Sequence, residues 1–336
     1  MYKRKRGEYI AGVSLFNTIW LSLIGVGLCL LMLISVGAMW QWVTEEHFSA
    51  PPIPTVRAVQ RPAVGPVATS VPVNPNVSLL LPEGARLILS SANGDIFANE
   101  ANGTAFVKSL LHGSEVTVAP DGRTLAYTRS GGLYIYRAGR EETVSISGNI
   151  IMPAWNATGD GLAFVLREAN GDSVYRVPLD SLQPVHLLTV PEIVAPPLTN
   201  PATGRLLIVE KLGAKQTIFY TIDPDCTTQI DCAKSRRDVA MVNRAVNWAS
   251  YHPNAASLVF SDLDDGNLYL LLTGSGDVQP VVMDSGYKRR PTFNKDGSWL
   301  AYVNVTDGGK LYVFRISDKH IYSIPFGSIA SLSWVN

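Results

Sequence analysis

The chain has 336 residues, and its 28 lysines and arginines balance 28 aspartates and glutamates, so the formal net charge is zero. This balance argues against a basic protein that binds nucleic acid, and it excludes a disordered acidic tail protein. A hydrophobic content of 46%, with 28 glycines and 21 prolines, indicates a chain that buries a sizeable core and turns often.

The first predicted element is a helix that crosses a membrane. The 36 residues between Glu8 and Glu45 contain no Asp, Glu, Lys or Arg, and about 20 apolar residues in a helix suffice to span a bilayer. Basic residues at positions 3–6 precede this stretch, so the positive-inside bias places the N-terminus in the cytoplasm. We therefore expect a cytoplasmic basic tail at residues 1–10 and a single-pass transmembrane signal anchor at residues 11–43.

A cleaved signal peptide is the alternative interpretation of this segment. Val36-Gly37-Ala38 has the small-residue form of a cleavage site, although the apolar stretch is longer than the 7 to 15 residues usual for a signal peptide. In either case, the rest of the chain is expected to lie outside the cytoplasm.

A proline-rich linker is expected at residues 44–76. Seven prolines lie between positions 51 and 75, among Ala, Val and Thr. This composition favours polyproline II structure. At ~3.1 Å per residue, such a linker could hold a domain several tens of Å from the membrane.

The remaining residues, 77–336, contain a pattern that occurs six times. Each copy has a turn followed by a short apolar strand, as in Pro120-Asp121-Gly122 before Leu125-Ala126-Tyr127, and successive copies are 38, 37, 45, 51 and 42 residues apart. Turn dipeptides such as Gly131-Gly132 and further alternating strands follow most copies. Each unit of about forty residues therefore predicts a four-stranded antiparallel sheet.

Six such sheets predict an all-β fold, a six-bladed β-propeller preceded by one transmembrane helix. One sheet cannot bury both of its faces alone, and radial stacking of sheets solves this problem. The end of the chain resembles an innermost strand, with Trp334 at the position that Trp155 has in its own copy. We expect this strand to complete the first blade beside Leu87-Ile88-Leu89, with Ser78-Leu79-Leu80-Leu81 as its competitor.

The repeat also carries a family resemblance. Residues 120–136 read Pro-Asp-Gly-x-x-Leu-Ala-Tyr and then Gly-x-Leu-Tyr-Ile-Tyr, which resembles the repeat of TolB-type and related WD40-like propellers. The resemblance covers residues 77–336. It implies a component of an envelope complex outside the cytoplasm. TolB itself is soluble, so the predicted membrane anchor departs from that arrangement.

Two cysteines lie close together in the long insertion of the fourth copy. Cys226 and Cys232 are separated by five residues, and a local disulfide between them fits an oxidising exterior. The alternative is a pair of free thiols. A zinc site is disfavoured, because no nearby Cys-x-x-Cys or histidine pair supplies further ligands.

Three consecutive basic residues form the predicted partner-binding site. Lys288, Arg289 and Arg290 enter the innermost strand of the sixth copy. We expect them to lie near one propeller face, where they could meet an acidic partner or anionic headgroups. A solvated loop without a binding role is the alternative.

The search for catalytic motifs is negative. The sequence contains no Gly-x-Ser-x-Gly elbow, no His-Glu-x-x-His and no phosphate loop. We therefore predict a non-enzymatic binding or scaffold module that needs no cofactor, binds a protein or glycan partner outside the membrane, and could be a subunit of a membrane or envelope complex. The alternative function is a propeller-type hydrolase or lyase with its site at the central channel.

Overall fold

The computed structural model describes residues 81, 86–99 and 105–335. The predicted cytoplasmic tail, signal anchor and linker at residues 1–76 lie outside this part of the chain, as do Ser78, Leu79 and Leu80 of the competing strand. Within the described ranges, no helix is long and apolar enough to cross a membrane.

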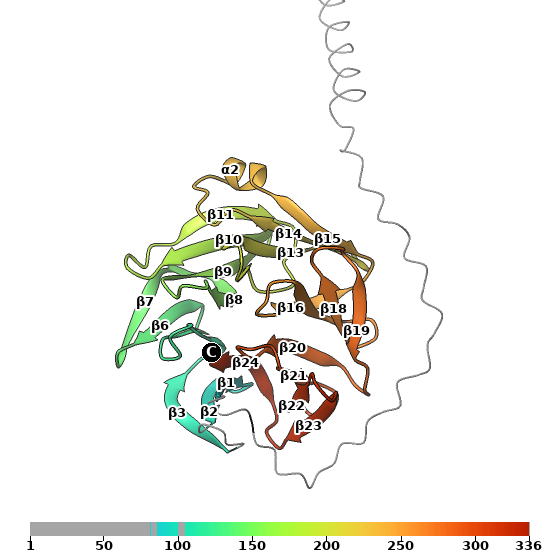
Figure 1. The fold of residues 1–336 in the computed structure, drawn as a ribbon. Helices are drawn as coiled ribbons and strands as arrows, with labels where there is room; N and C mark the ends of the chain where they lie inside the picture. The colour runs from blue at the N-terminus through green and yellow to red at the C-terminus, as the bar shows by residue number, and fades with distance from the viewer. Residues whose placement is uncertain (1–80, 82–85, 100–104, 336) are drawn as a thin grey trace, which may run out of the picture. The chain divides into compact units, whose positions relative to one another are not determined.

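In the described residues, 24 strands form six four-stranded antiparallel sheets around a common axis (Figure 1). This arrangement confirms the predicted six-bladed propeller. From the axis outward, blade 1 contains β24 (Ile329–Val335), β1 (Arg86–Ser91), β2 (Asp95–Asn99) and β3 (Phe106–His112). Blade 2 contains β4 (Ser114–Val118), β5 (Leu125–Arg129), β6 (Gly132–Arg137) and β7 (Arg140–Ser147). Blade 3 contains β8 (Asn149–Trp155), β9 (Gly161–Glu168), β10 (Gly171–Pro178) and β11 (Val185–Val190).

Blades 4 to 6 follow the same order. Blade 4 contains β12 (Leu198–Thr199), β13 (Leu206–Gly213), β14 (Gln216–Ile222) and β15 (Arg237–Val242). Blade 5 contains β16 (Val246–Tyr251), β17 (Ser257–Asp262), β18 (Leu268–Leu272) and β19 (Val278–Val282). Blade 6 contains β20 (Lys288–Phe293), β21 (Trp299–Asn304), β22 (Lys310–Arg315) and β23 (His320–Ile324). One short helix, α2 (Gln229–Lys234), lies between β14 and β15.

The repeated turn and strand have a local physical origin, as blade 2 shows. The Asp121 carboxylate accepts hydrogen bonds from the backbone N–H groups of Arg123 and Thr124, both at 2.8 Å, which closes the turn between β4 and β5. Gly122 takes a positive φ of 67° there, a conformation that glycine adopts without strain. The first three residues of β5, 125–127, are all buried, because β5 lies inside the sheet and neighbouring blades cover both of its faces.

The last strand closes the ring. β24 pairs antiparallel with β1, with Leu87 opposite Trp334 and Leu89 opposite Leu332. The indole N–H of Trp334 also donates to the carbonyl of Thr292 in blade 6, at 2.9 Å. The predicted closure is therefore confirmed, and β24 links the C-terminal end of the chain to blades 1 and 6.

Candidate functional site

A groove of about 700 Å³ opens between blades 3 and 4 and reaches the edge of blade 2. Its walls come from four places: the end of β6, the β8–β9 turn, the segment after β10, and the part of blade 4 around β12 and the β14–β15 connection. Its charged and polar lining residues include Arg137, Asn156, Thr158, Asp160, Arg176, Asp180 and Asp225.

Prolines explain why the groove lies at blade 4. Its innermost strand, β12, has only two residues, whereas the innermost strands of the other blades have five to seven. Pro196 and Pro197 precede β12 and Pro201 follows it, and proline has no N–H to donate to a neighbouring strand. Pairing is therefore confined to two residue pairs of β12 and β13, and the groove opens beside this shortened strand.

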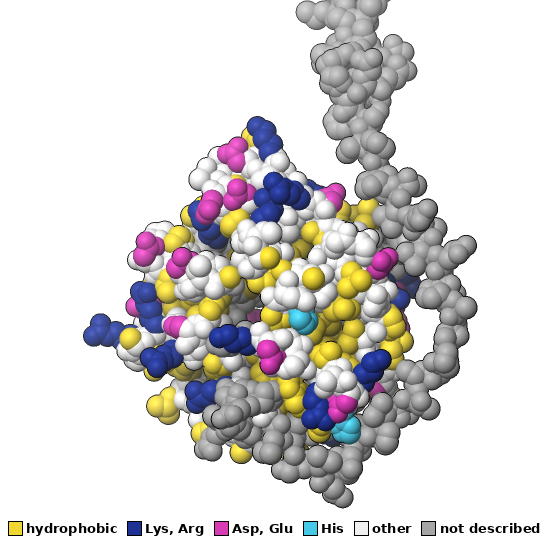
Figure 2. Space-filling view, viewed as in Figure 1, with side chains coloured by type: hydrophobic (Ala, Val, Ile, Leu, Met, Phe, Trp, Pro, Cys, Tyr) yellow, Lys and Arg dark blue, Asp and Glu magenta, His cyan; other side chains and the backbone are white. Residues whose placement is uncertain are grey.

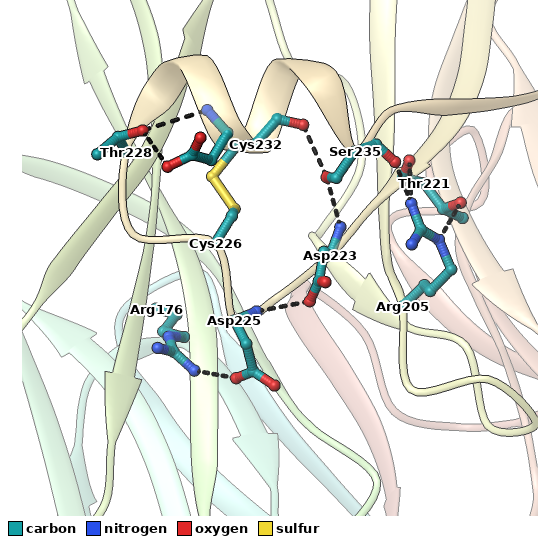
Figure 3. Close-up of a disulfide and its surroundings, with 10 residues drawn as sticks. Arg176, Arg205, Thr221, Asp223, Asp225, Cys226, Thr228, Cys232 and Ser235 are labelled. Atoms are coloured by element: carbon teal, nitrogen blue, oxygen red, sulfur yellow. Dashed lines mark hydrogen bonds and ion pairs between the residues drawn. A yellow bond between two sulfur atoms is a disulfide. The ribbon is translucent and has the colours of Figure 1, made fainter.

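A disulfide braces one wall of the groove (Figure 3). Cys226 and Cys232 are bonded, as the sequence predicted, with their Cα atoms 5.2 Å apart. Both are buried in a core cluster that includes Leu187 of blade 3 and Ile218 of blade 4. The disulfide thus anchors the β14–β15 insertion over the junction of these two blades, and it holds Asp225 at the groove.

Hydrogen bonds also order the helix of this insertion. Thr228 caps the N-terminus of α2, since its hydroxyl oxygen accepts from the N–H of Asp231 at 3.2 Å. At the other end, the Ser235 hydroxyl donates to the carbonyl of Cys232 and accepts from the N–H of Asp223. The insertion is therefore a fixed structure around the disulfide, as Figure 3 shows.

Both arginines of the groove are already neutralised. Arg176 donates to Asp225 at 2.6 Å, which links blade 3 to the insertion of blade 4 (Figure 3). Arg137 forms an ion pair with Glu142 at 2.7 Å. These two pairs contribute no net charge to the groove.

Two carboxylates at the groove lack such neutralisation. Asp160 accepts hydrogen bonds from the amide of Asn156 at 2.5 Å and the hydroxyl of Thr158 at 2.7 Å. These bonds stabilise the ionised form and lower the pKa of Asp160. Exposed Asp180 lies on the adjoining segment, where the N–H of Leu179 donates to the carbonyl of Asp160. Within the described residues, neither aspartate forms an ion pair with a cation.

The central channel contains a second, much smaller cavity of about 90 Å³. Innermost strands of the blades line it, and four of them carry a residue with positive φ at a bulge: Glu115 (49°), Met152 (57°), Trp248 (124°) and Arg290 (54°). Arg290 donates to both carboxylate oxygens of Glu115, at 2.6 and 3.0 Å, and its guanidinium lies 4.4 Å from the Trp248 ring centroid. This constellation holds blades 2, 5 and 6 together at the axis.

The three predicted partner-binding residues do not form one exposed patch. Lys288 is only 1% exposed, and its ammonium donates to the carbonyls of Asp284 and Gly286 at 2.5 and 2.9 Å. Arg290 lies in the channel as described above, and only Arg289 is exposed. The expectation of a common surface is corrected here, because alternate residues of β20 point to opposite sides and the bulge redirects the third. A binding role for Arg289 stays a prediction.

Groups with catalytic or metal-binding potential are dispersed in the part of the chain that the structure describes. No three His, Cys, Asp or Glu residues come together there as a metal site. His252, in the β16–β17 turn, packs edge-on against the ring of Phe293, with centroids 4.8 Å apart. Buried Asp262 forms an ion pair with Arg244 at 2.5 Å.

Sequence reasoning did not identify the groove residues. None of Asn156, Thr158, Asp160, Arg176 and Asp225 was singled out in the sequence analysis. A signal was present in the sequence, since four prolines lie between positions 191 and 201 and the fourth copy is among the longest. Such a break in the strand pattern marks the one blade with a shortened inner strand.

Charged side chains of both signs are interspersed on the propeller face that Figure 2 shows, while hydrophobic side chains gather nearer its centre. No large area of a single charge covers this face, as far as the structure describes it. The described part of this face therefore has no extended charged surface that would favour a partner of one charge.

Comparison with known proteins bears on the fold. No protein-family model and no curated protein matches the chain. Among solved structures, TolB from Acinetobacter baumannii is similar at 13% identity with a TM-score of 0.60, over 75% of this chain and 66% of that chain. A chain of a nidogen/laminin complex is similar at 14% identity with a TM-score of 0.57, over 75% and 99% of the two chains.

A third structure, the putative TolB from Agrobacterium tumefaciens, is 12% identical with a TM-score of 0.55, over 73% of this chain and 91% of that chain. At such low identities, the likeness shows the fold alone. It supports the predicted resemblance to TolB-type propellers at that level.

Proposed function

We propose that this protein is a membrane-anchored, extracytoplasmic β-propeller that binds a partner protein without converting it chemically. The observation that carries the proposal is the groove between blades 3 and 4. Its volume of about 700 Å³ lies within the roughly 300–1,000 Å³ usual for ligand sites. Function on a propeller resides in the loops that its blades present, and this groove is built from such loops.

The rigid construction of the groove supports a binding role. The disulfide, the α2 cap and the Arg176–Asp225 ion pair order the walls before any partner arrives. A preformed surface loses less conformational entropy on association than a mobile one. The similar chain from the nidogen/laminin complex is a propeller found in a protein assembly, and we extend that kind of role to this protein.

The central channel is the less favourable location for a site. Its cavity of about 90 Å³ is well below the roughly 300–1,000 Å³ usual for ligand sites. The Glu115–Arg290 pair and the Trp248 ring line this cavity and contact each other there. We therefore place the proposed site in the groove.

The anchor belongs to the same proposal. Residues 11–43 are expected to hold the propeller at the outer side of a membrane, on the strength of their length and of the basic residues at positions 3–6. Carbonate-resistant pelleting of full-mass protein, with protease digestion of the propeller only from outside, is the expected result. Recovery of a chain that begins near Met39 would instead establish signal-peptide cleavage.

Site-specific photo-cross-linking in intact cells tests the binding role. A photoreactive residue at exposed Thr158 of the groove is compared with one at exposed Gln279, on the outer strand of blade 5. We expect a protein adduct from the first position alone, and the identified partner, once purified, should bind the chain saturably and emerge unchanged. Equal capture at both positions, or turnover of the captured partner, would contradict the proposal.

A further inference from the structure

We propose that the groove between blades 3 and 4 receives a basic side chain, Lys or Arg, from a protein segment. This inference rests on the proposed function and specifies the chemistry of the partner. Three independent features of the groove lead to it: its charge balance, its apolar walls and its fixed geometry.

The charge balance favours a cation. The positive charges of Arg137 and Arg176 are matched by Glu142 and Asp225, as the ion pairs above show. Asp160 and Asp180 remain as two negative charges without a cationic partner among the described residues. Both aspartates are exposed at the groove, where their negative charge favours a cationic group.

The segments that carry the two carboxylates are joined through their backbones. The backbone hydrogen bond from Leu179 to Asp160, at 2.8 Å, joins the segment that carries Asp180 to the β8–β9 turn. The hydrogen bonds from Asn156 and Thr158 orient the Asp160 carboxylate and keep it ionised. Both aspartates thus line one groove, into which a guanidinium or ammonium group can enter.

Apolar side chains behind this anionic edge explain the preference for a long basic side chain over a small cation. Ala157, Pro178, Leu179 and Pro224 line the groove, and each is exposed or half-buried, so their apolar surface is accessible there. Lys and Arg bury their methylene stems against apolar surface and keep the charged head at its polar edge. A divalent metal ion would gain nothing from these apolar walls, and it prefers more oxygen ligands than two carboxylates supply.

Fluorescence anisotropy with a defined probe tests this inference on the full chain. The probe is a fluorescein-labelled peptide, Gly-Gly-Arg-Gly-Gly, and the control peptide has Glu in place of Arg. We expect saturable binding of the Arg peptide that weakens with added salt, and no binding of the Glu peptide. The double variant D160N/D180N should weaken binding at least tenfold, and each single variant about threefold.

Asp277 provides a matched control. It lies in the β18–β19 turn of blade 5, is exposed, and accepts a hydrogen bond from a neighbouring hydroxyl, that of Ser275, much as Asp160 does from Thr158. D277N should bind the Arg peptide as the parent does. Near-parental unfolding temperatures of all variants would show that the propeller remains folded.

Each outcome is decisive. Unchanged binding in D160N/D180N, equal binding of both peptides, or saturable Ca²⁺ binding in place of peptide binding would overturn the inference. If the captured protein partner binds the parent and D160N/D180N equally, this inference fails while the proposed function stands. If the Arg peptide binds as expected but cross-linking yields no protein, the groove chemistry stands and the proposed function fails.

Discussion

Replacement of Arg290 or Glu115 by Gln is expected to loosen the propeller at its axis. These residues are 175 positions apart, and their ion pair joins blades 2 and 6. Both side chains are mostly buried, with exposures of 20% and 18%. A single substitution therefore leaves the opposite charge in a confined position without its partner.

The magnitude follows from this intermediate burial. Breaking a fully buried pair costs about 3–5 kcal/mol, and an exposed pair contributes about 0.2–1 kcal/mol, so we expect each single variant to lose about 2–3 kcal/mol of unfolding free energy. R290Q should lose roughly 0.5–1 kcal/mol more than E115Q, because it also removes the cation–π contact with Trp248. In E115Q/R290Q no charge is left uncompensated, which predicts a coupling energy of about 1–2 kcal/mol.

Urea unfolding of the parent, both single variants and the double variant measures this coupling. The exposed pair Arg315–Asp318, with side-chain exposures of 38% and 45%, is the matched control, and its coupling should be below about 0.5 kcal/mol. The control coupling should also fall in 1 M salt, whereas that of the channel pair should persist. A channel coupling no larger than that of the control would refute the reasoning.

Three further predictions concern the rest of the fold. Deletion of residues 329–336 removes β24, so it should expose the edge of β1, lower the unfolding temperature and promote association. A truncated protein that remains a fully stable monomer would show that β24 does not close the ring. Replacing Cys226 and Cys232 together by Ser should lower the unfolding free energy by roughly 2 kcal/mol and increase protease cleavage between β14 and β15. Protease resistance equal to that of the parent would argue against the bracing role of the disulfide. K288M should destabilise the propeller because it leaves buried carbonyl oxygens without a donor, whereas R289S should be neutral. Equal unfolding temperatures of K288M and R289S would contradict the placement of Lys288.

The closure of the ring was predictable because its determinants repeat along the chain. Trp155 and Trp334 occupy equivalent places, each opposite a leucine of the second strand and each with its indole N–H directed at a carbonyl of the preceding blade's inner strand. A position that recurs in the sequence therefore predicted a contact between the two ends of the propeller.

The surroundings of the three consecutive basic residues could not be predicted from the sequence. Lys288, Arg289 and Arg290 are adjacent in the sequence, yet one is buried, one is exposed and one lies in the channel. Strand alternation alone would place the first and third on one side. The bulge between Arg289 and Thr292 breaks that alternation. Pro291 lies within the bulge, and proline in a strand is typical of bulges, but it does not predict where the Arg290 side chain points.

By itself, the sequence determined the blade number, the four-stranded sheets, the ring closure and the disulfide, because each depends on short-range patterns: turn residues, alternating apolar strands and two nearby cysteines. Only the tertiary structure decided where the groove opens and which charges in it stay unpaired. Arg176 meets Asp225 across 49 positions, and Glu115 meets Arg290 across 175. Such pairings arise when separate blades pack around a common axis, so no local pattern records which carboxylates, such as Asp160, remain without a cation.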